Sequence, residues 1–79
     1  MKTMTCRQLG GACDLPFVAS TFDEIAALSH KHGAAMLQQG DKPHMEAMNK
    51  MRELMQAPGG MQKWMEERRS EFDALPSNL

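Results

Sequence analysis

Residues 6–13 of this 79-residue chain read CRQLGGAC and contain both of its cysteines, with six residues between them. A short run lies on each side of Gly10-Gly11, KTMTCRQ over residues 2–8 and ACDLPFV over residues 12–18. Because both glycines accept positive φ, the pair predicts the two-residue turn of a β-hairpin. The hairpin would bring the two cysteines to one end of the fold.

The register of this hairpin decides how the two thiols face each other. With Gly10-Gly11 as the turn, Cys6 pairs with Leu15 and becomes a diagonal neighbour of Cys13, roughly 7–8 Å away. That spacing exceeds the usual disulfide Cα separation of about 4.4–6.8 Å. A loop over residues 8–11 would instead pair Cys6 directly with Cys13 and permit a disulfide. Both registers place the thiols on one face.

A helix is predicted to follow the hairpin. Residues 21–24 read TFDE, which is the pattern of a capping box, since Thr21 and Glu24 can each satisfy a main-chain N–H of the other. The helix should run over residues 22–39 and end at Gly40. Gly33 lies inside it and indicates either a close contact or a break.

Two more helices are predicted, over residues 41–56 with Asp41 as the cap, and over residues 61–74. The sequence APGG at residues 57–60 separates them. We therefore predict an α+β fold, an N-terminal β-hairpin followed by three α-helices, the last two forming an antiparallel helical hairpin.

The predicted elements form one small domain over residues 1–79. Residues 1–40 would hold the β-hairpin and the first helix. Residues 41–79 would hold the helical hairpin, which is rich in methionine. A chain this short buries a small core, so a metal, a crosslink or a partner chain would add useful stability.

Composition excludes several classes of function. The net charge is −1 and no basic stripe is present, so we expect no nucleic-acid partner. No apolar run approaches the about 20 residues of a membrane span, and Lys2 is not followed by a hydrophobic signal region. We therefore expect a cytoplasmic protein without a membrane partner. In a reducing compartment two cysteines bind metal, do redox work or remain thiols.

Three histidines are candidates to join the thiols. His32 follows the apolar positions Ile25 and Leu28 at helical spacing, so it should face the hairpin. His30 lies two residues earlier, about 200° around the helix, and should face solvent. His44 begins a different pattern, described next.

His44, Met48, Met51 and Met55 follow one another at intervals of four, three and four residues. This stripe is typical of the buried face of a helix, which methionine fills adaptably. It could also form a surface for a protein partner or a second copy. Thioethers and imidazoles are ligands of Cu(I), so a copper site is a further alternative.

The residues of the first 33 positions resemble the domain of unknown function 1059 family, whose members are described as predicted small metal-binding proteins. The resemblance rests on Cys6, Cys13, the capped helix and His32-Gly33. It implies Cys6, Cys13 and His32 as metal ligands. The family's helix often carries another histidine about one turn earlier, where this chain has residues 26–28 AAL. His30 or His44 could supply the fourth ligand, and the alternatives are an open site with three ligands or a site that has been lost.

The expected function is therefore metal binding, with zinc as the metal. The alternatives are a non-catalytic interaction or oligomerisation module that uses the helices of residues 41–75, and a dithiol–disulfide redox switch. No phosphate-binding loop, catalytic triad or His-Glu-x-x-His motif is present, so the sequence does not point to an enzyme.

Overall fold

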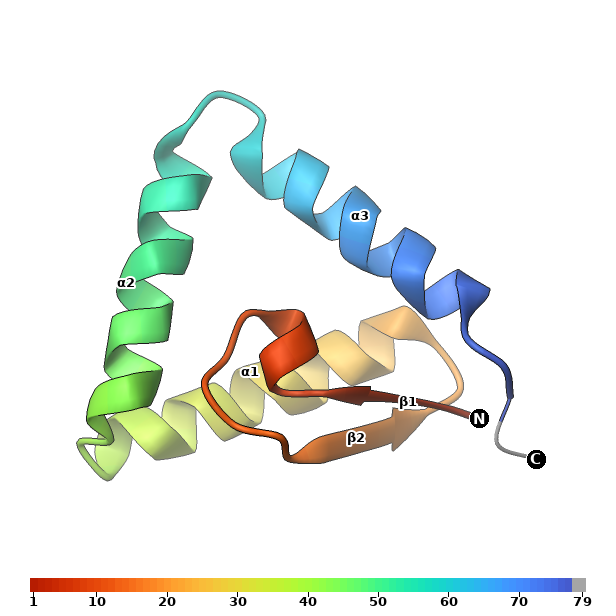
Figure 1. Cartoon of the computed structure of the whole chain (residues 1–79), viewed down its shortest axis with the longest axis horizontal. Coiled ribbons are helices and arrows are strands. Elements are labelled where there is room, and N and C mark those ends of the chain that lie inside the picture. Colours follow the sequence, from red (N-terminus) through yellow and green to blue (C-terminus); the bar gives the residue numbers. More distant parts are fainter. Residues whose placement is uncertain (78–79) are drawn as a thin grey trace.

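A computed structural model describes residues 1–77 of the chain. Figure 1 shows a two-stranded hairpin followed by three helices, which confirms the predicted α+β architecture. In chain order the elements are β1 (Lys2–Thr5), the 3₁₀-helix η1 (Arg7–Leu9), β2 (Pro16–Ala19), α1 (Phe22–Gln38), α2 (Lys42–Gln56) and α3 (Gly60–Ala74). Asn78 and Leu79, the last residues of the predicted domain, lie outside the described part.

The hairpin has the predicted antiparallel register but not the predicted turn. β1 pairs with β2 so that Thr5 faces Pro16, and the Cys6 N–H donates to the Leu15 carbonyl at 2.8 Å. The two-residue turn at Gly10-Gly11 is wrong, because regular pairing ends at Thr5. There the side chains of Thr5 and Gln8 each accept a hydrogen bond from the other's main-chain N–H, which starts η1 instead.

α1 begins as predicted with the capping box of Thr21 and Glu24. Gly33 does not break the helix. It is buried, and an added Cβ would lie 2.7 Å from the terminal methyl carbon of Met48, so it permits a close approach of α2. The helix ends at Gln38, and Gly40, with φ of 70°, turns the chain toward α2.

The core lies between the hairpin and the inner face of α1. Met4 and Ile25 are fully buried there, together with Leu9, Phe17, Ala19 and Phe22. Phe72 of α3 completes this core by packing edge-on against Phe22, with ring centroids 6.0 Å apart. The Lys2 ammonium donates to the Phe72 carbonyl at 3.0 Å, which ties the end of α3 to the first strand.

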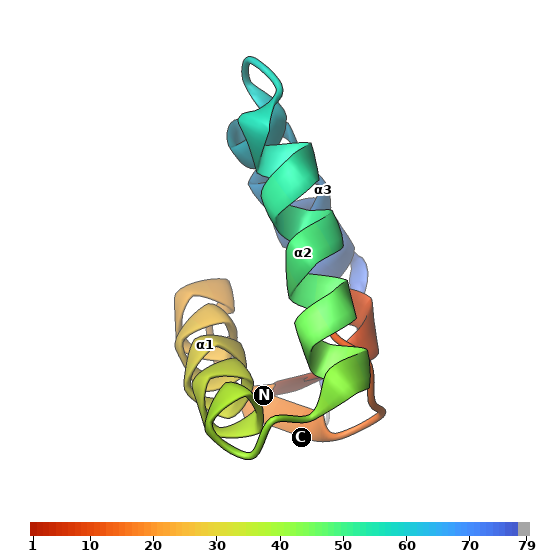
Figure 2. The same ribbon diagram turned by 90° about the vertical axis from the view of Figure 1, so that its left-hand side faces the viewer.

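α2 and α3 meet at their short connection and spread apart from it, so that the two helices form a V (Figures 1 and 2). They thus form the predicted helical hairpin in an open form, and the molecule is flat, with extents of 35 × 31 × 15 Å. The methionine stripe of α2 is only partly the buried face that its spacing suggests. His44 is buried, whereas Met48, Met51 and Met55 are half-buried. No helix within residues 1–77 has the length and apolar character of a membrane span.

Candidate metal centre

Four side chains that can bind a metal ion converge where the hairpin loop meets the adjoining ends of α1 and α2. The sulfur atoms of Cys6 and Cys13 and one ring nitrogen each of His32 and His44 all lie within 4.8 Å of one another. Cys6 and His44 are buried, and Cys13 and His32 are half-buried. These four residues could together hold a metal ion.

Each thiol already lies next to one imidazole. The Cys6 Sγ is 3.6 Å from the His44 Nε2, and the Cys13 Sγ is 3.3 Å from the His32 Nε2. In a tetrahedral zinc site, with Zn–S of about 2.3 Å and Zn–N of about 2.05 Å, sulfur and nitrogen ligands are about 3.6 Å apart. These two sulfur–nitrogen distances are therefore close to those between the ligand atoms of a tetrahedral zinc site.

The loop between the cysteines wraps around the Cys6 sulfur, and this is the role of the glycine pair. Gly10 ends η1 with φ of 90°, and the Gly11 N–H donates to the Cys6 carbonyl at 2.8 Å. A Cβ on Gly11 would lie only 2.1 Å from the Cys6 Sγ. Since φ of Gly11 is not positive, the absence of a side chain serves close approach rather than backbone conformation.

Main-chain N–H groups face both thiols and favour their thiolate forms. Burial raises the pKa of the Cys6 thiol, and hydrogen bonds from the main chain at Cys13 and Ala12 oppose that increase. The pKa of the Cys13 thiol is lowered, first by a hydrogen bond from the main chain of Leu15 and further by His44. Thiolates are the metal-binding form of cysteine, so the loop is suited to present sulfur ligands.

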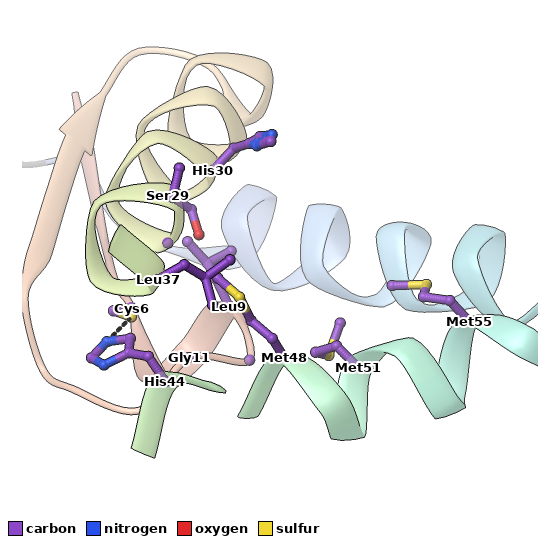
Figure 3. A pocket seen from close by; sticks show the side chains of 13 residues that line it. Cys6, Leu9, Gly11, Ser29, His30, Leu37, His44, Met48, Met51 and Met55 are labelled. Carbon is purple, nitrogen blue, oxygen red and sulfur yellow. Dashed lines mark hydrogen bonds between the residues drawn. The ribbon is translucent and has the colours of Figure 1, made fainter. Parts of the chain in front are cut away.

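His32 and His30 of α1 face different surroundings, as their positions on the helix predict. His32 projects from α1 into the cluster, and the edge of Phe17 packs against its ring with centroids 5.7 Å apart. His30 is exposed and does not belong to the cluster; Figure 3 shows it at the rim of the adjacent pocket, apart from Cys6 and His44. Of the two candidates for a fourth ligand, His44 is the one that the fold brings to the thiols.

His44 reaches the cluster because the chain reverses between α1 and α2. The Gly40 N–H donates to the Leu37 carbonyl, and Asp41 then caps α2 by accepting a hydrogen bond from the His44 main-chain N–H at 3.1 Å. The rings of His32 and His44 meet edge-on, with centroids 5.2 Å apart. His44, at the start of α2, thus lies beside His32 of α1.

The carboxylate of Asp41 also fixes the His44 ring. His44 Nδ1 donates to Asp41 Oδ2 at 2.5 Å, so in the neutral imidazole the lone pair is on Nε2, which faces Cys6. The hydrogen bond from His44 lowers the pKa of Asp41, and the same bond raises the pKa of His44. A carboxylate behind the ring is the usual support of a metal-binding histidine.

Comparisons with protein-family models, with curated proteins and with solved structures find no significant match to this chain. The resemblance to the domain of unknown function 1059 family therefore stays a prediction.

Two residues of the site had little signal in the sequence. His44 belongs to the methionine stripe, where its spacing indicates helix packing rather than ligation. The position of Asp41 before a predicted helix indicates only a cap. The spacing of Asp41 and His44 could have indicated their contact. A cap lies close enough to the third residue of its helix to bind that residue's side chain as well as its N–H.

Proposed function

We propose that the protein binds one zinc ion through Cys6, Cys13, His32 and His44. The observation that carries this proposal is the pair of sulfur–nitrogen contacts, each thiol beside one imidazole, at 3.6 and 3.3 Å. Two thiolates and two imidazoles are a common donor set of structural zinc sites, which are tetrahedral. Borderline-soft zinc accepts both kinds of ligand.

The proposed role is structural. The four ligands come from the hairpin loop, α1 and α2, so a shared ion would join three segments that are far apart in the sequence. Four protein ligands leave no open position for a substrate, which distinguishes structural from catalytic zinc sites. A chain with a core as small as this one gains folding free energy from such a link.

Elemental analysis of the untagged protein, purified under reducing conditions, tests this proposal. We expect about one zinc ion per chain, because the four ligands form one site. Cobalt(II) should substitute for zinc and give the visible absorption of a tetrahedral thiolate site. No bound metal, together with no spectral change on adding cobalt(II) to the reduced protein, would contradict it.

The chain provides a matched control for the ligands. His32→Ala removes an imidazole of the cluster, whereas His30→Ala removes an exposed imidazole of the same helix. We expect the His32 variant to lose metal and the His30 variant to keep it. Equal loss in both variants would show that metal content follows helix stability rather than ligation.

A further inference from the structure

The two sulfur atoms of the candidate metal centre lie close enough to react with each other. Both cysteines are free, and the Sγ atoms of Cys6 and Cys13 are within 4.8 Å of one another. Their main chains are also neighbours, because the Arg7 N–H donates to the Cys13 carbonyl at 2.8 Å. The predicted separation of roughly 7–8 Å requires regular pairing up to the glycine pair, whereas pairing ends at Thr5. A disulfide can therefore form by adjustment of the loop between the cysteines.

A disulfide and a zinc ion cannot occupy this site together. In a tetrahedral site with Zn–S of about 2.3 Å, the two sulfur ligands are about 3.8 Å apart. In a disulfide they are about 2.05 Å apart. The bond also removes both thiolates, which are the form of cysteine that binds metal. The same pair of residues thus offers two exclusive states, a zinc ligand pair and a covalent bond.

The two thiols differ in their access to a reagent from solvent. Cys6 is 3% exposed and lies against Gly11 and the ring of His44 (Figure 3). Cys13 is half-buried, so a reagent reaches it first. The main chain at Leu15 lowers the pKa of Cys13, whereas burial raises the pKa of Cys6, which favours Cys13 as the attacking thiolate as well. The pair therefore has an accessible thiol and a sheltered thiol beside it.

We infer that Cys13 is a site of exchange with a low-molecular-weight disulfide such as oxidised glutathione, and that Cys6 then closes an internal disulfide that expels zinc. The Cys13 thiolate attacks one glutathione sulfur, forms a mixed disulfide and releases one glutathione thiolate. The Cys6 thiolate attacks the Cys13 sulfur, breaks the mixed bond and releases the second glutathione thiolate. Two protein thiolates are thus oxidised to one disulfide, one glutathione disulfide is reduced to two thiolates, and Zn²⁺ is set free.

This exchange would regulate the proposed site, and the inference therefore rests on the zinc proposal. Both cysteines lie at the hairpin loop, whereas the other two candidate ligands, His32 and His44, lie on α1 and α2. The disulfide closes the loop on itself and leaves neither helix joined to it through an ion. Oxidised protein should accordingly have a lower melting temperature than the reduced zinc-loaded protein.

Oxidised glutathione, added without air to the reduced full chain, tests the inference on zinc-loaded and metal-free samples. This reagent exchanges with thiols and leaves the nine methionines unchanged. Intact mass under non-reducing conditions should show the loss of two hydrogen atoms and no bound glutathione. A colorimetric chelator should detect one zinc ion released per disulfide formed, and dithiothreitol with added zinc should reverse both changes. Retention of both thiols, glutathione accumulating on both cysteines, or a disulfide between two chains would overturn the inference.

The two samples separate this inference from the zinc proposal. If the chain binds zinc and neither sample forms the internal disulfide, the zinc proposal stands and this inference is overturned. If the chain binds no zinc, the zinc proposal fails and the expulsion fails with it. The metal-free sample then decides by itself whether exchange at Cys13 and closure by Cys6 stand.

Single-cysteine variants of the metal-free protein identify the thiol that reacts first. Cys6→Ser keeps Cys13 and should accumulate its mixed disulfide with glutathione, because no second thiol resolves it. Cys13→Ser keeps the buried thiol and should react at least about tenfold more slowly. Circular dichroism checks that each variant is folded. If one is not, acid quenching of the unaltered protein early in the reaction, followed by peptide mapping, locates the first adduct. Equal rates in the two variants, or a first adduct on Cys6, would overturn the assignment of Cys13.

Discussion

Asp41 accepts two hydrogen bonds from His44, one from the main-chain N–H at 3.1 Å and one from the imidazole Nδ1. The first starts α2, and the second aims Nε2 at the Cys6 sulfur. One carboxylate thus couples the beginning of a helix to the orientation of a candidate metal ligand. The two functions can be separated, because serine caps a helix about as well as aspartate but provides no carboxylate for the ring.

Asp41→Ser should therefore weaken metal binding, and at a pH where His44 is neutral it should change the stability of the metal-free protein little. Loss of a carboxylate behind a ligating histidine typically lowers metal affinity about 10- to 100-fold. Competition with a zinc chelator measures that affinity, and urea unfolding of the metal-free protein measures the cap. Asp41→Ala is the companion variant, and it should also lose about 1 kcal/mol of stability. Unchanged zinc affinity in Asp41→Ser would mean that the ring needs no support from this carboxylate.

Gly11→Ala should displace the Cys6 sulfur and lower metal affinity at least about tenfold, as large an effect as is found when a residue that supports a metal ligand is changed. The added Cβ would lie 2.1 Å from that sulfur, so the loop or the cysteine must move. Chelator competition again gives the affinity.

Gly40→Ala is the matched control for Gly11→Ala. Gly40 has φ of 70° and no atom within 4 Å of an added Cβ, so alanine there introduces backbone strain without a clash. It should cost about 1–2 kcal/mol of stability and leave the metal content intact. If Gly40→Ala lost metal as readily as Gly11→Ala, close packing around the sulfur would not be the cause.

Metal occupancy should fall as pH falls, because protons compete for the same ligand atoms. The raised pKa of His44 means that its Nε2 takes a proton at a higher pH than an ordinary histidine would. Burial raises the pKa of the Cys6 thiol, so this sulfur also takes up a proton at a higher pH than an ordinary cysteine. The pKa of Cys13 is lowered, so its sulfur remains a thiolate to a lower pH. Zinc release followed with a colorimetric chelator should therefore begin as pH drops below neutrality. Asp41→Ser, whose zinc affinity should be lower, should begin to release zinc at a higher pH, and no movement would contradict the assignment.

The Asp41–His44 pair itself should stabilise the metal-free protein most in mild acid. The His44 contribution is complete below its unfolded pKa of about 6.5 and is lost as pH rises through the raised folded value. The Asp41 contribution is present above its unfolded pKa of 3.8 and is lost as pH falls through the lowered folded value. Urea unfolding of the metal-free protein across this range, compared with Asp41→Ser, measures the difference, which should be largest between these limits.

Features set by nearby residues could be predicted from the sequence. The capping box of Thr21, the cap at Asp41 and the breaks at Gly40 and residues 57–60 each depend on contacts within a few positions, and the structure has all of them. The register of the hairpin was also correct. Local chemistry decides such elements almost independently of the rest of the fold.

The predicted turn between the cysteines is wrong, and the sequence left both His30 and His44 open as the fourth candidate ligand. Gly10-Gly11 has the composition of a tight hairpin turn, but the loop instead packs around a sulfur atom, which is a requirement of the site. His44 approaches Cys6 across 38 positions of sequence, and the path of the chain between α1 and α2 determines that approach. Neither outcome is encoded in the spacing of adjacent residues.

Phe72→Ala should destabilise the fold strongly without removing a metal ligand. Phe72 is 4% exposed, packs edge-on against Phe22 and lies under the Lys2 ammonium, so it anchors α3 to the core. Truncating a buried phenylalanine costs about 3–5 kcal/mol, a large part of the stability of a chain this small. Met61→Ala, at a 61% exposed position of the same helix, should change stability by less than about 0.5 kcal/mol. Thermal unfolding with and without zinc compares the two variants. Because the four candidate ligands lie before α3, zinc should still bind Phe72→Ala and raise its melting temperature. If Phe72→Ala instead had the melting temperature of Met61→Ala, contacts other than Phe72 would hold α3 to the core.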